Sequence, residues 1–283
     1  MAQGSAESKT AEQILNEPGA PVVMFDHVSL AFDDKVILKD VSFTLISGHT
    51  KIILGASGAG KSITLKILLG LLKPDSGVVW VNGHRVDQLG EEEMMVVRAN
   101  LGMVFQEGAL FDSLTVRENV GYRFYEETDM PLEEVDRRVQ EVLGFVGLGE
   151  FIDRMPSALS GGQRRRVAIA RAMASKPKIL FYDEATTGLD PITATTVDDE
   201  IIKLRDLENV SSIVVTHQLR DAFYVATHTA VREKNGEIRI VTATRHKEQE
   251  AEFLMLRDGL IVFEGDADAL RNSTDEYLQT FLS

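Results

Sequence analysis

Short apolar runs alternate along the chain with turn residues and with segments of helical spacing. Runs with the length and composition of strands lie at 22–30, 41–46, 51–54, 179–182 and 212–216. Helical spacing follows the third of these runs over 62–72, and a Pro-Asp-Ser-Gly sequence at 74–77 ends it. Strands that alternate with helices on this scale predict an α/β fold with a mainly parallel sheet.

Two segments depart from this alternation. Residues 91 to about 149 show mostly helical spacing, which predicts a helical lobe inserted into the α/β core. The tail has the pattern of a terminal amphipathic helix, with apolar side chains available for packing at Leu270, Tyr277, Phe281 and Leu282. We therefore expect an N-terminal arm (1–20), a main domain (21–265) with a helical subdomain at about 91–175 and an inserted hairpin at about 232–252, and a C-terminal helical tail (266–283).

Composition narrows the classes of ligand. The chain has 283 residues, of which 44% are hydrophobic, so it can bury a sizeable core. Its 30 Lys and Arg against 44 Asp and Glu give a formal charge of −14, which repels nucleic acid. The absence of cysteine excludes disulfides, thiolate metal sites and thiol nucleophiles. Because no run approaches the roughly 18 apolar residues of a membrane span and no secretory signal precedes the first strand, we expect a soluble or peripheral protein.

A glycine-rich loop between an apolar strand and an apolar helix carries the clearest chemistry. It fits the pattern G-x-x-x-x-G-K-[ST], in which glycines let the backbone wrap closely, successive N–H groups bind anions and the helix adds its positive end. Lys61 is expected to pair with the β- and γ-phosphates of a nucleotide, and the Ser62 hydroxyl to ligate Mg²⁺. The alternative is a turn that only links a strand to a helix. The candidate residues are Gly55, Ala56, Ser57, Gly58, Ala59, Gly60, Lys61, Ser62 and Ile63.

Two carboxylates end the apolar run at 179–182. Asp183 is the candidate partner of Mg²⁺, and Glu184 is the candidate base that polarises an attacking water. The alternative is an acidic strand end that caps the next turn, but a phosphate-binding loop in the same chain favours the catalytic interpretation. His217 ends another apolar run, and taken alone it is better explained as a turn histidine.

Six motifs occur in the order found in ABC transporter ATPases, and residues 22–264 resemble that family. The motifs are the Walker A loop (Gly55–Ser62), the Q-loop glutamine (Gln106), the LSGGQ signature (Leu159–Gln163), Walker B with its catalytic glutamate (Asp183, Glu184), the D-loop (Thr187–Asp190) and the switch histidine (His217). The resemblance implies a P-loop NTPase of ABC type, with a RecA-like core, an antiparallel β subdomain and an inserted helical subdomain. It also implies hydrolysis of ATP with Mg²⁺.

In this family two subunits pair head to tail, and each ATP lies between the Walker A loop of one subunit and the signature of the other. The resemblance therefore implies a homodimer in which the partner's nucleotide is contacted by Ser160, Gly161, Gly162, Gln163 and Asp190. Glu184 and His217 would orient the attacking water, and Gln106 would couple the metal and this water to the groove that receives a membrane subunit. Phe32 falls where such ATPases stack an aromatic ring on adenine, and a buried core Phe is the competing interpretation.

Three stretches, at 60–66, 105–120 and 189–192, are similar to the ATPases of Mla-type lipid transporters that work with MCE proteins. This similarity implies permease subunits and an MCE-type lipid-binding protein as partners, phospholipid or a related lipid as cargo, and a location at the cytoplasmic face of the inner membrane. The apolar triplet Ala109-Leu110-Phe111 would sit in the groove that grips a coupling helix, with core packing as the alternative. Alternative functions are an ATPase for another cargo, such as an amino acid or a lipoprotein, and a soluble ATPase of the iron–sulfur assembly type.

One insert departs from the family pattern. Members usually pass almost directly from a strand like that at 229–231 to an Asp-Gly turn, here Asp258-Gly259, whereas this chain inserts residues 232–252. Asn235-Gly236 between extended residues predicts a β-hairpin with a tight primed turn. Its mixed charges are compatible with a solvated surface hairpin and with a surface for a partner or for self-association.

Overall fold

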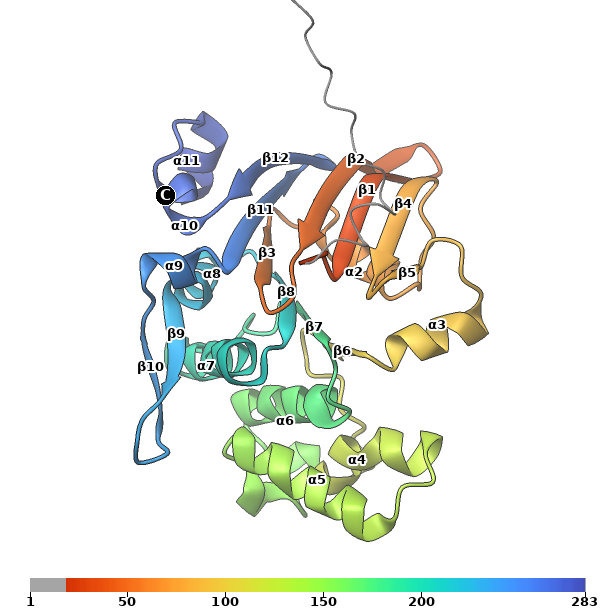
Figure 1. Cartoon of the computed structure of the whole chain (residues 1–283), viewed down its shortest axis with the longest axis vertical. Coiled ribbons are helices and arrows are strands. Elements are labelled where there is room, and N and C mark those ends of the chain that lie inside the picture. Colours follow the sequence, from red (N-terminus) through yellow and green to blue (C-terminus); the bar gives the residue numbers. More distant parts are fainter. Residues whose placement is uncertain (1–18, 283) are drawn as a thin grey trace, which may run out of the picture.

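The computed structural model describes residues 19–282, and two β-sheets with helices around them form its body (Figure 1). The predicted N-terminal arm lies, up to residue 18, outside the described residues. The larger sheet has the strand order β12-β11-β3-β8-β7-β6. Its strands are β3 (Thr50–Leu54), β6 (Leu101–Val104), β7 (Ile179–Asp183), β8 (Ser211–Val215), β11 (Ala251–Arg257) and β12 (Leu260–Gly265).

The larger sheet is parallel except at its β12 edge, which confirms the α/β prediction. Its central strands β3 and β8 are buried along their whole length, because helices cover both faces of a parallel sheet. Strand β6 was missed by the prediction of mostly helical structure after residue 91. Only four residues long, it is recognised as a strand through its pairing with β7, from Leu101 beside Ile179 to Val104 beside Tyr182.

A smaller antiparallel sheet has the order β2-β1-β4-β5. Its strands are β1 (Val23–Phe32), β2 (Lys35–Leu45), β4 (Ser76–Val81) and β5 (His84–Arg85). The rings of Phe25 and Phe43 stack across β1 and β2 with centroids 4.8 Å apart. This face shares one apolar core with Ile53 of β3 and Phe181 of β7, and with helices α2 (Lys61–Leu68) and α3 (Glu91–Arg98). The two sheets are therefore held together around the phosphate-binding loop.

A helical lobe lies on the far side of the larger sheet (Figure 1). It is made of α4 (Val116–Glu127), α5 (Leu132–Phe145) and α6 (Gly161–Ala174), with short 3₁₀ turns η1 (Gly149–Phe151) and η2 (Pro156–Ala158). On α5 the apolar spacing places Val135, Val139 and Val142 on one fully buried face. Because α6 packs against α4, α5 and β6, it is buried on several sides and joins the lobe to the sheet.

The inserted hairpin consists of β9 (His228–Arg232) and β10 (Ile238–Thr242), which pair only with each other, and α9 (Arg245–Glu248) follows it. The strand at 229–231, which we placed before the insert, thus forms one arm of the hairpin, and β11 is the strand that pairs with β3. The predicted primed turn is also wrong, since Gly236 (φ 87°) has a left-handed backbone and Asn235 does not. A loop over 234–236, closed by the Glu233 N–H bond to the Glu237 carbonyl, forms instead.

The C-terminal tail forms two short helices, α10 (Ala267–Arg271) and α11 (Glu276–Leu282), where we expected one. The break has a local cause, since Asp275 Oδ1 accepts the backbone N–H groups of Tyr277 (2.9 Å) and Leu278 (3.0 Å) and so starts a new helix. Leu270 and Leu278 are buried, and the tail packs against the core as predicted from its apolar side chains.

Two neighbouring residues of α7 (Pro191–Glu208) hold the hairpin to the core. Arg205 and Asp206 are almost fully buried and form a two-pronged ion pair, with nitrogen–oxygen distances of 2.8 and 3.0 Å. Arg205 also donates to the carbonyl of His228 (2.7 Å), while Asp206 accepts from the Thr229 hydroxyl (2.8 Å) and the Ala230 N–H (2.7 Å). The charges of the pair are therefore satisfied by the first residues of β9.

We expect Asp206→Ala to lower the free energy of unfolding by about 3–5 kcal/mol, because it leaves the Arg205 guanidinium buried without its counter-charge. Glu127→Ala is the matched control, since it breaks the exposed i,i+4 pair with Arg123. That change should cost only about 0.3–0.5 kcal/mol. Urea unfolding followed by circular dichroism measures both. Equal losses in the two variants would contradict the assigned role of the buried pair.

Candidate active site

The phosphate-binding loop connects the end of β3 to the start of α2, between the two sheets. Gly60 precedes the helix with φ 103°, a backbone that favours glycine, and a Cβ there would lie 2.7 Å from Leu38 Cδ2. No side chain caps the first N–H groups of α2. These groups and the positive end of the helix are therefore directed to the loop, where an anion can accept their hydrogen bonds.

Lys61 lies at the centre of this loop and is only 5% exposed. Its Nζ donates to the carbonyl oxygens of Gly55 (2.8 Å) and Ala56 (3.0 Å), and lies 3.8 Å from Glu184 Oε1. Burial lowers the pKa of the Lys61 amine, against the opposing effects of the Glu184 and Asp183 carboxylates. The ammonium group is thus held in position beside the carboxylates.

Ser62 and Asp183 meet although they are far apart in the sequence. The Ser62 hydroxyl donates to Asp183 Oδ1 at 2.9 Å, which joins the first turn of α2 to the end of β7. Burial raises the pKa of the Asp183 carboxyl, and the hydrogen bond from Ser62 partly offsets this effect. A hydroxyl and a carboxylate are hard oxygen ligands, so the pair fits Mg²⁺, which protein sites commonly hold with one or two carboxylates plus substrate phosphates.

Glu184 follows β7 in a left-handed backbone conformation (φ 50°), which is uncommon for a residue other than glycine. Its N–H donates to the Val215 carbonyl (2.9 Å), and its Oε2 accepts from the Thr187 hydroxyl (3.3 Å). The other oxygen, Oε1, lies 3.2 Å from Nδ1 of His217, the second residue after β8. His217 therefore contacts the candidate base.

Of these side chains, Lys61, Ser62 and Glu184 line a pocket of about 450 Å³, whereas Asp183 and His217 are not part of its lining. Its lining is Phe32, Lys35, Ile37, Ser57, Gly58, Gly60, Lys61, Ser62, Ile63, Gln106 and Glu184. Phe32 is 44% exposed, so the alternative of a buried core Phe is wrong. Sequence reasoning missed Lys35 and Ile37, which reach the pocket because the β1–β2 turn brings them next to Phe32. Ala59 belongs to the buried core behind the loop.

The segment after Gln106 is held in place by hydrogen bonds from two side chains. Asn119, fully buried, bonds the backbone of Phe111 and the carbonyls of Leu114 and Thr115. Arg171 of α6 donates to the carbonyls of Gly108 and Ala109, both at 2.9 Å. Of the apolar triplet, Ala109 is exposed, Leu110 is half-buried and Phe111 is 42% exposed, so core packing explains Leu110 only.

The signature residues lie at the start of α6 and do not line the pocket. Ser160 Oγ accepts the Gln163 N–H (3.3 Å), and Gln163 Oε1 accepts the Ser160 N–H (2.8 Å), so the two residues form a capping box. Gly162 packs against α7, where a Cβ would lie 2.1 Å from Thr193 Cγ2, and Gly161 faces Leu189. Asp190 caps α7 by accepting two backbone N–H groups at 3.1 Å.

Comparisons with known proteins show which family the chain resembles. The family described as ABC transporter matches residues 38–187. Protein TRIGALACTOSYLDIACYLGLYCEROL 3, chloroplastic, of Arabidopsis thaliana is 37% identical over 89% of this chain and 70% of its own length. Methionine import ATP-binding protein MetN of Bifidobacterium longum is 38% identical over 75% of the chain. The chain spans only 54% of that importer and 60% of the glycine betaine/carnitine protein GbuA of Listeria monocytogenes.

A solved structure of an ATP-binding cassette has a similar fold. The dimeric ATP-binding cassette MJ0796, in a post-hydrolysis state bound to ADP and Pi, superposes with a TM-score of 0.69. It is 30% identical, and the match covers 86% of this chain and 98% of that one. Because the family match takes in more than half of the chain, including the phosphate-binding loop and the acidic strand end, we conclude that the chain belongs to the ABC transporter family as one of its ATPases.

Proposed function

We propose that this pocket binds ATP and that Glu184 directs the attack of water on the γ-phosphate. The observation that carries the proposal is the position of one carboxylate oxygen, Glu184 Oε1, between the ammonium of Lys61 (3.8 Å) and the imidazole of His217 (3.2 Å). A base held at the mouth of a phosphate site by two such neighbours has the arrangement that general-base catalysis requires. Phe32 at the rim offers a ring for the adenine.

In this mechanism Glu184 accepts a proton from the water, and His217 holds the carboxylate and the water in line. Lys61 and the N–H groups at the start of α2 stabilise the charge that develops on the transferred phosphoryl group. Ser62, Asp183 and Gln106 are the residues that would hold Mg²⁺, whose charge, when the ion is bound, neutralises phosphate oxygens. All of these residues come from one chain.

A second copy completes the site in our proposal. The signature residues lie outside the pocket of their own chain, and the exposed Ser160 caps a helix whose positive end points to solvent. A head-to-tail homodimer places this helix end on the γ-phosphate held by the partner. The dimeric state of the similar cassette MJ0796 supports this assembly.

We further propose that the homodimer drives a permease at the cytoplasmic face of the inner membrane, together with an MCE-type protein, and that the cargo is phospholipid or a related lipid. The exposed rings of Phe105, Phe111 and Tyr122 near Gln106 offer an apolar surface to a coupling helix. No described helix has the length and apolar content of a membrane span. A relative matched over 89% of the chain bears the name of a glycolipid, and this name favours a lipid as the cargo.

An amino acid is the second candidate cargo. Several relatives that are 37–39% identical are named methionine import ATP-binding proteins. Because an ATPase subunit does not contact the cargo, this alternative leaves the proposed chemistry of the pocket unchanged.

The first test is Glu184→Gln. We expect the variant to bind ATP and to dimerise, because the shape of the side chain is kept. Its turnover should be slower than that of the original chain by a factor of about 100 or more, because the base is lost. Phosphate release and gel filtration with ATP measure these properties. Glu150→Gln, a change at an exposed site of η1, is the control and should keep the original rate. Hydrolysis by Glu184→Gln at the unmodified rate would contradict the assignment of Glu184 as the catalytic base.

The second test adds Ser160→Arg to the Glu184→Gln background. The bulky cation should block ATP-driven dimerisation, which light scattering during gel filtration detects. Ser47→Arg, at an exposed position in the turn after β2, is the matched control and should dimerise like the parent. Dimers of equal stability in both variants would rule out a signature-mediated interface.

The cargo is tested on the assembled complex. We expect purification in detergent to yield a permease subunit and an MCE-type protein, identified by mass spectrometry, with phospholipid in the organic extract. A complex that carries an amino acid-binding subunit and no specific lipid would overturn the lipid assignment, although hydrolysis by the ATPase would persist.

A further inference from the structure

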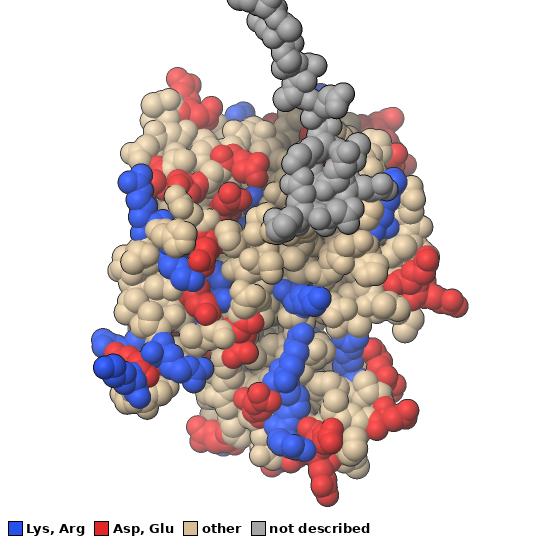
Figure 2. Space-filling model, in the orientation of Figure 1, with Lys and Arg blue, Asp and Glu red and all other residues tan. Residues whose placement is uncertain are grey.

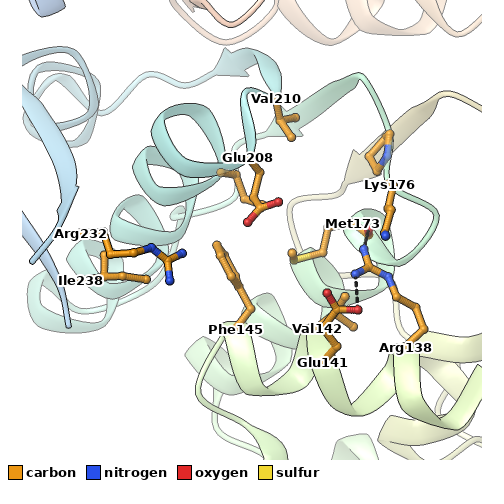
Figure 3. A pocket seen from close by; sticks show the side chains of 12 residues that line it. Arg138, Glu141, Val142, Phe145, Met173, Lys176, Glu208, Val210, Arg232 and Ile238 are labelled. Carbon is orange, nitrogen blue, oxygen red and sulfur yellow. Dashed lines mark hydrogen bonds and ion pairs between the residues drawn. The ribbon is translucent and has the colours of Figure 1, made fainter. Parts of the chain in front are cut away.

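A second hollow of about 480 Å³ lies beside the end of α6 and shares no residue with the nucleotide pocket (Figure 3). Its walls come from two parts of the molecule. One wall is the helical lobe, through Val142 and Phe145 of α5 and Met173 of α6. The other is the end of α7 and the inserted hairpin, through Leu204, Arg232 and Ile238. The hollow therefore exists because the hairpin stands beside the lobe.

Apolar side chains from both walls make up part of the lining. Val142 and Leu204 are buried at its base, and Phe145 extends between Met173 and the hairpin. Ile238 is half-buried on β10 and faces the same space. The volume is that of sites that take small molecules, and the lining offers them both apolar and charged groups.

Charged groups lie at the two ends of the hollow. At the lobe end, Arg138 is paired with Glu141 (2.7 Å) and donates to the carbonyls of Met173 (2.9 Å) and Ala174 (2.8 Å). Lys176 stands beside this pair, exposed, with no ion pair to any residue that the structure describes. At the hairpin end, Arg232 and Glu208 carry opposite charges on the two sides of the opening (Figure 3). The lining thus has three basic and two acidic side chains, and Lys176 is the basic group of the lobe end without an ion pair. The hollow is therefore net positive, although the chain as a whole carries −14 and acidic and basic side chains are mixed over the face seen in Figure 2.

We propose that this hollow binds a small amphipathic anion, with a carboxylate or phosphate group at Lys176 and an apolar part against Phe145, Met173 and Ile238. Charge complementarity places the acidic group at the lobe end, since Glu208 offsets the charge of Arg232 at the hairpin end, whereas Glu141 is already paired with Arg138 beside Lys176. The lining of the hollow contains none of the residues proposed for ATP hydrolysis. Because its walls belong to the lobe and to the hairpin, the bound molecule joins these two parts.

The test uses the full chain and three probes in isothermal titration calorimetry, namely decyl phosphate below its micelle concentration, inorganic phosphate and decanol. We expect decyl phosphate to bind once per chain, at least tenfold more tightly than either of the other two. Equal affinity for phosphate would show an anion site without an apolar part, and equal affinity for decanol would show an apolar site without charge recognition. Either result, or no saturable binding of decyl phosphate, would overturn the proposal.

Two pairs of variants locate the site. Lys176→Gln should weaken decyl phosphate about tenfold, whereas Lys178→Gln, an exposed lysine two residues away that does not line the hollow, should not. Ile238→Ser should also weaken binding, whereas Ile240→Ser, half-buried on the same strand but outside the lining, should leave it unchanged. Thermal unfolding of each variant confirms that it is folded. Equal affinities within both pairs would place the binding elsewhere.

Discussion

The ammonium group of Lys61 is buried, and a buried charge is stable only where other groups replace the water that it has lost. Two carbonyl oxygens of the loop and the nearby Glu184 carboxylate do so here. This requirement constrains the surrounding structure, since the loop must turn its carbonyls inward and β7 must end beside it. The strand order β3-β8-β7 satisfies both conditions and places His217, after β8, between the two sides. Phosphates of a nucleotide bring further negative charge to the same point.

Local chemistry explains which parts of the fold could be predicted from the sequence. The loop at Gly55–Ser62 and the buried strands β3, β7 and β8 were predictable, because their residue types are required within a few positions of one another. Strand β6 was not, since its four residues become a strand only through pairing with β7. Likewise, β9 has strand composition, yet the Arg205–Asp206 pair and the partner strand β10, not the main sheet, determine its place.

In the candidate site, too, residues within a local motif could be predicted and residues brought in by distant contacts could not. Residues that act through a motif, such as Lys61 and Ser62, were named from spacing alone, whereas Lys35 and Ile37 have no motif and are brought in by a turn. The separation of the signature from the pocket has a physical basis too. Because Gly162 packs tightly against Thr193, the start of α6 is held against α7 and does not reach the Lys61 loop of its own chain. The capping box accepts the Gln163 N–H, and in the proposed homodimer the N–H groups that precede it in the first turn are donors to the nucleotide of the other chain.

One helix connects the signature to the hollow beside the hairpin. Helix α6 has 14 residues, about 21 Å of rigid length, with Ser160 at its start and Met173 and Lys176 at and just beyond its end. A molecule in the hollow contacts this helix and also Ile238 of the hairpin, so its affinity depends on how the lobe is placed relative to α7. A ligand shifts a conformational equilibrium only through such a difference in affinity between the two states. Linkage is reciprocal, so any movement of α6 on nucleotide binding that changed the affinity of the hollow would require an occupant of the hollow to change nucleotide affinity by the same factor.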